Sequence, residues 1–199
     1  MIIYEYPFNE RIRTMLRLED LHERYKFFLQ QTHALQHHVA LTTIFEMLEV
    51  ASRSDLKSDL LQELERQKQI LSGFQSHPNI QKDVLDDVLR EIDKTSSALV
   101  NTLGKTGQSI RENEWLMSIR SRTSIPGGAC EFDLPSYYTW QHRAPDERAA
   151  DIAGWFAPMQ SLIDAVGLLL RLMRASGLQF KIIAHSGSYQ QMLQGKVHQ

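Results

Sequence analysis

The segment from residue 145 to residue 177 constrains the fold most, because a helix built from it is apolar on two sides. Its main stripe consists of Trp155, Met159, Leu162, Val166, Leu169 and Met173. A smaller stripe, roughly opposite, consists of Ala165, Leu168 and Leu172. Both faces of such a helix must be covered. We expect a central helix, and a helix shared between two copies of the chain is the alternative that the sequence leaves open.

Apolar residues recur at helical spacing in most of the remaining chain. The pattern predicts helices over residues 9–31, 34–53, 55–74, 80–103 and 109–123, and a short helix after Pro135. Asn9 is suited to cap the first helix, and Ser109 to Glu112 has the spacing of a capping box. Pro158 should kink the last helix near its start, and Gly177 should end it.

Three short segments are strand candidates. Residues 2–6 and 130–134 alternate apolar and polar side chains, and residues 180–184 follow the last helix. We therefore predict a predominantly α-helical α+β fold, with about six long or medium helices and one small sheet formed by the N-terminal strand and strands from the C-terminal half. The predicted helical domain comprises residues 9–124 and 136–177, and the predicted β domain comprises residues 1–8, 125–135 and 178–199.

The composition excludes several classes of protein. With 22 basic and 24 acidic residues the formal net charge is −2, unlike that of a strongly basic nucleic-acid binder. A single cysteine, Cys130, excludes an intrachain disulfide and a cysteine-rich metal site. The N-terminus lacks the pattern of a signal peptide, and the longest apolar run, Ala165 to Leu170, is too short to span a bilayer. We expect a soluble, cytoplasmic protein.

Motifs for catalysis, cofactors or metals are weak. Gly104-Lys105-Thr106 resembles the end of a phosphate loop, but the earlier glycine is missing and the tripeptide follows a helix. His33 and His37 have metal-ligand spacing without a glutamate between them. Nothing in the sequence brings His142 against Cys130 as a base. We predict no catalytic, cofactor or metal site.

The arginines are more informative. One helix face carries Arg13, Arg17 and Arg24. Arg120 and Arg122 precede the turn at residues 124–128. Guanidinium groups can bind carboxylates with two parallel hydrogen bonds. Asp20, however, is spaced to neutralise the first group, so spacing alone leaves both a binding face and a solvated ionic face open.

Two longer motifs resemble the ZapD family of cell-division proteins. They are NERIRTMLRLE at residues 9–19 and RSRTSIPGGACEFDLP at residues 120–135. Tyr138-Thr139-Trp140 and the segment at residues 187–191 fit as well, and the similarity extends over essentially the whole chain. Family members often have histidine at the position of Tyr138, and some have a basic residue at that of Glu114. The family also continues past residue 199 into further strands, so we expect a C-terminal truncation.

The resemblance implies a cytoplasmic, non-enzymatic, homodimeric factor at the mid-cell division site. Such a factor binds the C-terminal tail of FtsZ, the tubulin-like GTPase of the division ring, and bundles its protofilaments. By motif position, tail binding is carried over to Arg13, Arg17 and Arg122, with Arg120 beside them. We expect these side chains to converge in one cradle next to the sheet, with Tyr138 and Trp140 holding the apolar part of the tail. No cofactor, nucleic acid or membrane is implied.

Three other classes remain as alternatives. A helical scaffold would bind its partner through apolar helix faces, which makes Leu168 and Leu172 the residues to test. A small enzyme would need a deep pocket holding a carboxylate, histidine or thiol with a strongly shifted pKa. A nucleic-acid binder would need its arginines aligned in one extended stripe.

Overall fold

The computed structural model describes residues 4–52, 55–75, 81–102, 104–176, 182–184 and 186–190. Within these ranges the extended elements are helices, connected by turns and irregular segments, and Ser188 is an isolated β-bridge position. They follow in the order α1 (Glu10–Leu29), α2 (Ala34–Ser52), α3 (Leu56–Ser72), α4 (Lys82–Asn101), α5 (Gln108–Glu112), α6 (Glu114–Thr123), α7 (Pro135–Gln141), α8 (Pro145–Phe156), the 3-10 turn η1 (Ala157–Met159) and α9 (Gln160–Ser176).

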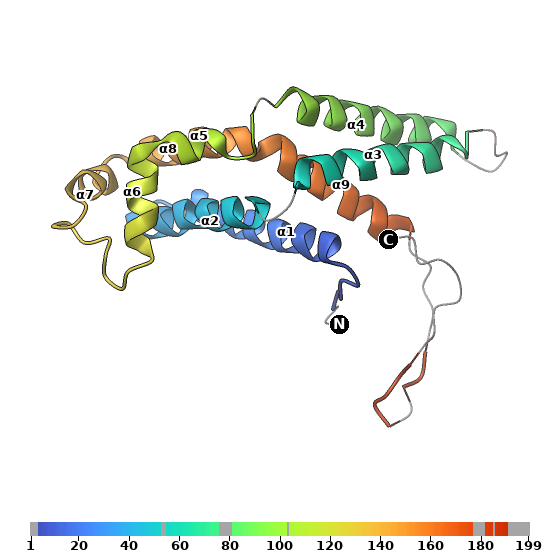
Figure 1. Ribbon diagram of the computed structural model, residues 1–199, viewed down its shortest axis with the longest axis horizontal. Helices are drawn as coiled ribbons and strands as arrows, with labels where there is room; N and C mark the ends of the chain where they lie inside the picture. The colour runs from blue at the N-terminus through green and yellow to red at the C-terminus, as the bar shows by residue number, and fades with distance from the viewer. Residues whose placement is uncertain are drawn as a thin grey trace.

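Two helical hairpins flank the last helix. Helices α1 and α2 pack against each other along their length, and α3 packs against α4. Figure 1 shows α9 running between the two hairpins, while α5 to α8 gather at the opposite end of the molecule. Helix α9 contacts α1, α3 and α4, so it is surrounded by elements from both hairpins.

The central position predicted for the last helix is confirmed. Leu162, Val166 and Leu169 of its main stripe are buried, and so are Ala165 and Leu168 of the opposite stripe. Fully burying one leucine or valine side chain contributes roughly 1.5–3 kcal/mol. The second stripe is therefore covered by this chain's own helices.

Pro158 interrupts the last helix as predicted. It lies in η1, which separates α8 from α9, and the ribbon changes direction there in Figure 1. Proline lacks the backbone N–H that a continuous helix needs and its ring clashes with the preceding turn. The predicted end of the helix at residue 177 lies outside the described residues.

Two predicted helix starts have different outcomes. The N–H of Ile12 donates to the side-chain oxygen of Asn9 over 2.8 Å, which confirms the cap of α1. The capping box at Ser109 is wrong, because the helix starts one residue earlier, after Gly107. The predicted helix over residues 109–123 is also divided. Asn113 has an extended backbone, and its side chain accepts the N–H of Leu116 over 3.0 Å, which starts α6.

The predicted small sheet is wrong for the part of the chain that the structure describes. Residues 4–6 are irregular, and residues 130–133 form a turn whose Cys130 carbonyl accepts the N–H groups of Asp133 and Leu134. The described residues of the third candidate, 182–184, are irregular too, and the other strand positions lie outside the description. Phe132 is 80% exposed whereas Leu134 is 7% exposed, so the alternating apolar side chains do not share one buried face. The described residues therefore form a helical fold without the predicted sheet.

The predicted helical domain contains the helices observed in the described residues, apart from Pro135, the first residue of α7. By length and hydropathy alone, Pro145–Ser176 is the one helical run among these residues that could cross a membrane. However, 50% of its most apolar window is buried inside the protein. Leu162, Val166 and Leu169 of this run belong to the hydrophobic core.

Candidate functional site

The arginines predicted for partner binding lie in two separate pairs. Arg13 and Arg17 are in the first half of α1, whose opposite side buries Met15 and Leu18. Arg120 and Arg122 are in the last turn of α6. In Figure 1 the start of α1 lies near the N-terminus, whereas α6 crosses the far end of the α1–α2 hairpin. The structure therefore does not form the single cradle beside a sheet that the sequence predicts.

The first pair shares one acidic neighbour. Glu10 lies 3.5 Å from Nε of Arg13 and 3.8 Å from Nη1 of Arg17. The two arginine side chains are 42% and 48% exposed. Ion pairs of this kind contribute about 0–1 kcal/mol. Because one glutamate lies at these distances from both arginines, each guanidinium group can still bind another anion.

The second pair has acidic neighbours at similar distances. Arg120 lies 3.6 Å from Glu49, and Arg122 lies 3.7 Å from Asp133 in the following turn. Their side chains are 35% and 47% exposed. Both charges stand at the negative end of the α6 dipole, which favours cations there. The turn is held by the N–H of Ile125, which donates to the Arg122 carbonyl.

Other arginines of this chain are bound more tightly. Arg174 donates hydrogen bonds of 2.6–2.8 Å to Glu5 and Glu19, and Arg11 donates one of 2.8 Å to Asp59. Among the described residues, no guanidinium of the two predicted pairs donates a hydrogen bond to an acid. Exchanging their present neighbour for the carboxylate of a partner therefore costs little.

A cavity of about 460 Å³ is lined by Arg120, one member of the α6 pair. Arg120, Thr123 and Ser124 line it on one side and His38, Phe45 and Glu46 of α2 on the other. Glu46 also accepts a hydrogen bond of 2.5 Å from Arg24 of α1. Arg17 and Arg24 thus pair with Glu10 and Glu46, and not with Asp20 as the spacing suggested.

The two aromatic candidates differ in access. Trp140 is 5% exposed, and its indole N–H donates to Asp151 over 2.9 Å. Its ring stacks on Tyr137 at 5.5 Å and also contacts Trp115 and Trp155. Tyr138 is 42% exposed because it lies on the other side of α7. Of these two, only Tyr138 presents its ring to solvent.

The weaker chemical candidates are not brought together. His37 is buried and accepts a hydrogen bond from Nε of Arg148, whereas His38 bonds to the Tyr137 hydroxyl over 2.6 Å. The thiol of Cys130 donates to the Gly127 carbonyl, and His142 bonds to the carbonyl of Tyr138.

Among the residues described, no three His, Cys, Asp or Glu side chains group as metal ligands would. Sequence reasoning also missed Arg148, which is 4% exposed and held by three backbone carbonyls. The spacing of apolar and polar residues along its helix does not distinguish Arg148 from an arginine on the surface.

Comparison with known proteins identifies the relatives. A family model described as ZapD, cell division protein, matches residues 16–199. The chain is 66% identical to cell division protein ZapD of Janthinobacterium sp. (strain Marseille) over 199 residues, which is 100% of this chain and 79% of that protein. Over the same shares it is 60% identical to the ZapD of Ralstonia pickettii (strain 12J) and 59% identical to that of Cupriavidus metallidurans.

Proposed function

Because this chain belongs to the ZapD family of cell division proteins, we propose that it binds the C-terminal tail of FtsZ and cross-links FtsZ protofilaments. The family supports a role in cell division. The proposal for the tail rests mainly on one observation, the two exposed arginine pairs whose guanidinium nitrogens lie 3.5–3.8 Å from the acidic side chains beside them.

In this mechanism the tail replaces the internal acids. A carboxylate of the tail takes the place of Glu10 or Glu49 and accepts charge-assisted hydrogen bonds from the guanidinium groups. Tyr138, exposed on α7, contacts apolar atoms of the tail. Each exposed ion pair is weak and is screened by salt, so one tail binds weakly and less strongly at high ionic strength.

Cross-linking requires two tail sites that act together. We propose that the chain forms a two-fold homodimer, which presents each site twice. A filament repeats its tail many times, so the effective concentration of tails near a bound dimer is high. Weak individual contacts then suffice to hold two filaments side by side. The protein would act without a cofactor or catalytic step, in the cytoplasm at the mid-cell division site.

The test is a titration of a labelled FtsZ tail peptide, followed by co-sedimentation with FtsZ filaments. Charge reversal of Arg13, Arg17, Arg120 and Arg122 to glutamate should abolish both signals, and adding salt should weaken binding by the unmodified chain. A control variant reverses two cations of another helix, Lys82 and the 76%-exposed Arg90 on α4, and should bind normally. Unchanged binding by the fourfold variant would remove these arginines from the mechanism.

The alternative of a scaffold that binds through an apolar helix face is less well supported. It relies on the smaller stripe of the last helix. Leu168 of that stripe is 4% exposed and Leu172 packs partly buried against the core, so this stripe is used within the chain.

A further inference from the structure

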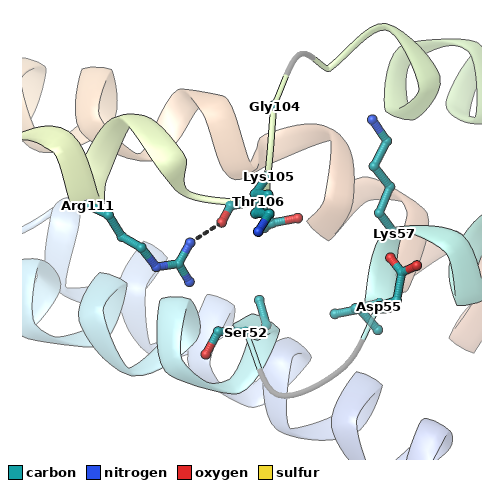
Figure 2. Close-up of a pocket in the computed structure, with 9 residues that line it drawn as sticks. Ser52, Asp55, Lys57, Gly104, Lys105, Thr106 and Arg111 are labelled. Carbon is teal, nitrogen blue, oxygen red and sulfur yellow. Dashed lines mark hydrogen bonds between the residues drawn. The ribbon is translucent and has the colours of Figure 1, made fainter.

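A second basic site lies where the α3–α4 hairpin joins the remainder of the chain. It is a cavity of about 660 Å³ between the end of α2, the start of α3 and the loop before α5. This volume is in the range of small-ligand sites. Figure 2 shows Arg111 of α5 directed toward Thr106, with Lys105 next to it, and Asp55 and Lys57 at the start of α3.

The charges around this cavity do not balance. Its lining carries three cations, Lys57, Lys105 and Arg111, and one carboxylate, that of Asp55. Arg111 donates to the carbonyls of Thr106 and Leu48, over 2.6 and 3.3 Å, and Lys57 donates to the carbonyl of Thr102 over 2.7 Å.

The Lys105 ammonium makes no hydrogen bond or ion pair among the described residues, whereas its backbone N–H donates to the Gln108 side chain. None of the three cations is neutralised by an acid within those residues, so the cavity favours an anion.

The backbone adds to the positive potential. Asp55 precedes α3, but its side chain makes no capping bond to the first N–H groups of this 17-residue helix. Such groups, together with the helix dipole, attract anions. This contribution comes on top of the three side chains.

The loop that carries Lys105 and Thr106 is closely packed. Gly104 and Gly107 have φ values of +74° and +68°, and a Cβ on Gly107 would lie 2.0 Å from Cδ1 of Leu48. The Lys105 N–H donates to the side chain of Gln108 over 3.1 Å. These contacts hold the loop against α2. Because the loop is already ordered, less conformational entropy is lost when a ligand binds.

We propose that this cavity binds an anion carrying phosphate groups, and that the bound anion joins the α3–α4 hairpin to the α1–α2 hairpin. Ser52 at the end of α2 and Asp55 before α3 line the cavity, and so do Gly104 and Lys105 before α5. An anion held between Lys105, Arg111 and the start of α3 contacts both sides of this joint. The site does not depend on the proposed binding of FtsZ.

The test uses sodium pyrophosphate in isothermal titration calorimetry at low, constant ionic strength. We expect one site per chain and a higher unfolding temperature when it is filled. Lys105→Ala should weaken binding about tenfold, because one charge-assisted contact is lost. Circular dichroism should be unchanged, since the Lys105 ammonium supports no other described group.

Lys82→Ala is the matched control, because α4 has 20 residues and Lys82 begins it, about 30 Å from the end near the cavity. Equal weakening in both variants, or a response to sodium chloride equal to that to pyrophosphate, would show non-specific attraction and overturn the proposal.

Arg111→Gln should also reduce pyrophosphate affinity, and its folding is checked by a cooperative thermal transition. ADP in place of pyrophosphate distinguishes the source of the phosphate groups. Tighter binding of ADP assigns a nucleotide, and equal or weaker binding assigns an inorganic anion. Failure of both ligands to bind would overturn the proposal, while leaving tail binding by the two arginine pairs untouched.

Discussion

Arg148 and His37 meet inside the protein, where Nε–H of Arg148 donates to Nδ1 of His37 over 3.1 Å. Arg148 also donates to the carbonyls of Thr32 and Gln141, over 2.6 and 3.0 Å, and to that of Arg143. No carboxylate pairs with Arg148 in the part of the chain described. One buried guanidinium therefore joins the α1–α2 turn to the α7–α8 turn, and it requires His37 to be neutral.

Stability should fall in mildly acidic solution. Burial lowers the pKa of His37, and Arg148 adds to the effect. Burial also lowers the pKa of His38 and His22. The unfolded chain therefore binds protons more readily than the folded protein. The contribution of these histidines to the free energy of unfolding is complete above about pH 6.5, the histidine pKa of the unfolded chain, and is lost as pH falls through the folded pKa.

Urea unfolding between about pH 7.5 and about pH 5 measures this loss. His37→Gln should reduce the pH dependence. The exposed His33→Gln is the control and should leave it unchanged. A free energy of unfolding that stays constant over this range would contradict the prediction.

Arg148→Met should be strongly destabilising. It leaves three carbonyls and the His37 ring nitrogen without their donor, and unsatisfied buried groups cost about 1–3 kcal/mol each before relaxation. We expect a total loss of about 3 kcal/mol in the free energy of unfolding. Arg90→Met, at an exposed site, should change it by less than about 0.5 kcal/mol. Similar effects from the two changes would mean that the buried guanidinium is dispensable.

Two glycine-to-alanine changes should have opposite signs. Gly107→Ala places a Cβ at a positive φ and 2.0 Å from the Leu48 side chain, so it should cost about 2 kcal/mol or more. Gly167→Ala lies within α9 with nothing within 4 Å of the added Cβ. It should stabilise the protein by about 0.5–1 kcal/mol. Thermal unfolding of both variants checks the signs, and a stabilising Gly107→Ala would refute the close packing of this loop.

Tyr138 and Trp140 should separate binding from stability. Trp140→Ala removes a buried ring and should cost about 3–5 kcal/mol of unfolding free energy. Tyr138→Ala should leave stability within about 1 kcal/mol and weaken FtsZ tail binding severalfold. Urea titration and the labelled-peptide assay measure the two effects. Normal tail binding by Tyr138→Ala would exclude this ring from the proposed site.

Local patterns predicted the helices well because helix formation depends on neighbours three and four residues apart. Asn9 caps a helix, and Pro158 interrupts one, as the chemistry of each side chain requires. Alternation near Cys130 failed as a signal for a strand, since a few alternating residues specify a sheet only when an apolar layer covers one face. There the chain forms local turn hydrogen bonds instead.

By itself, the sequence determined the helical segments, the two-sided last helix and membership of a family of cell division proteins. Tertiary structure alone decided that the two arginine groups lie apart, that Trp140 is buried beside an exposed Tyr138, and that Arg148 meets His37. The reason is physical. Spacing along a helix sets which side chains share a face, but only the packing of distant helices sets which faces meet and which charges remain open to solvent.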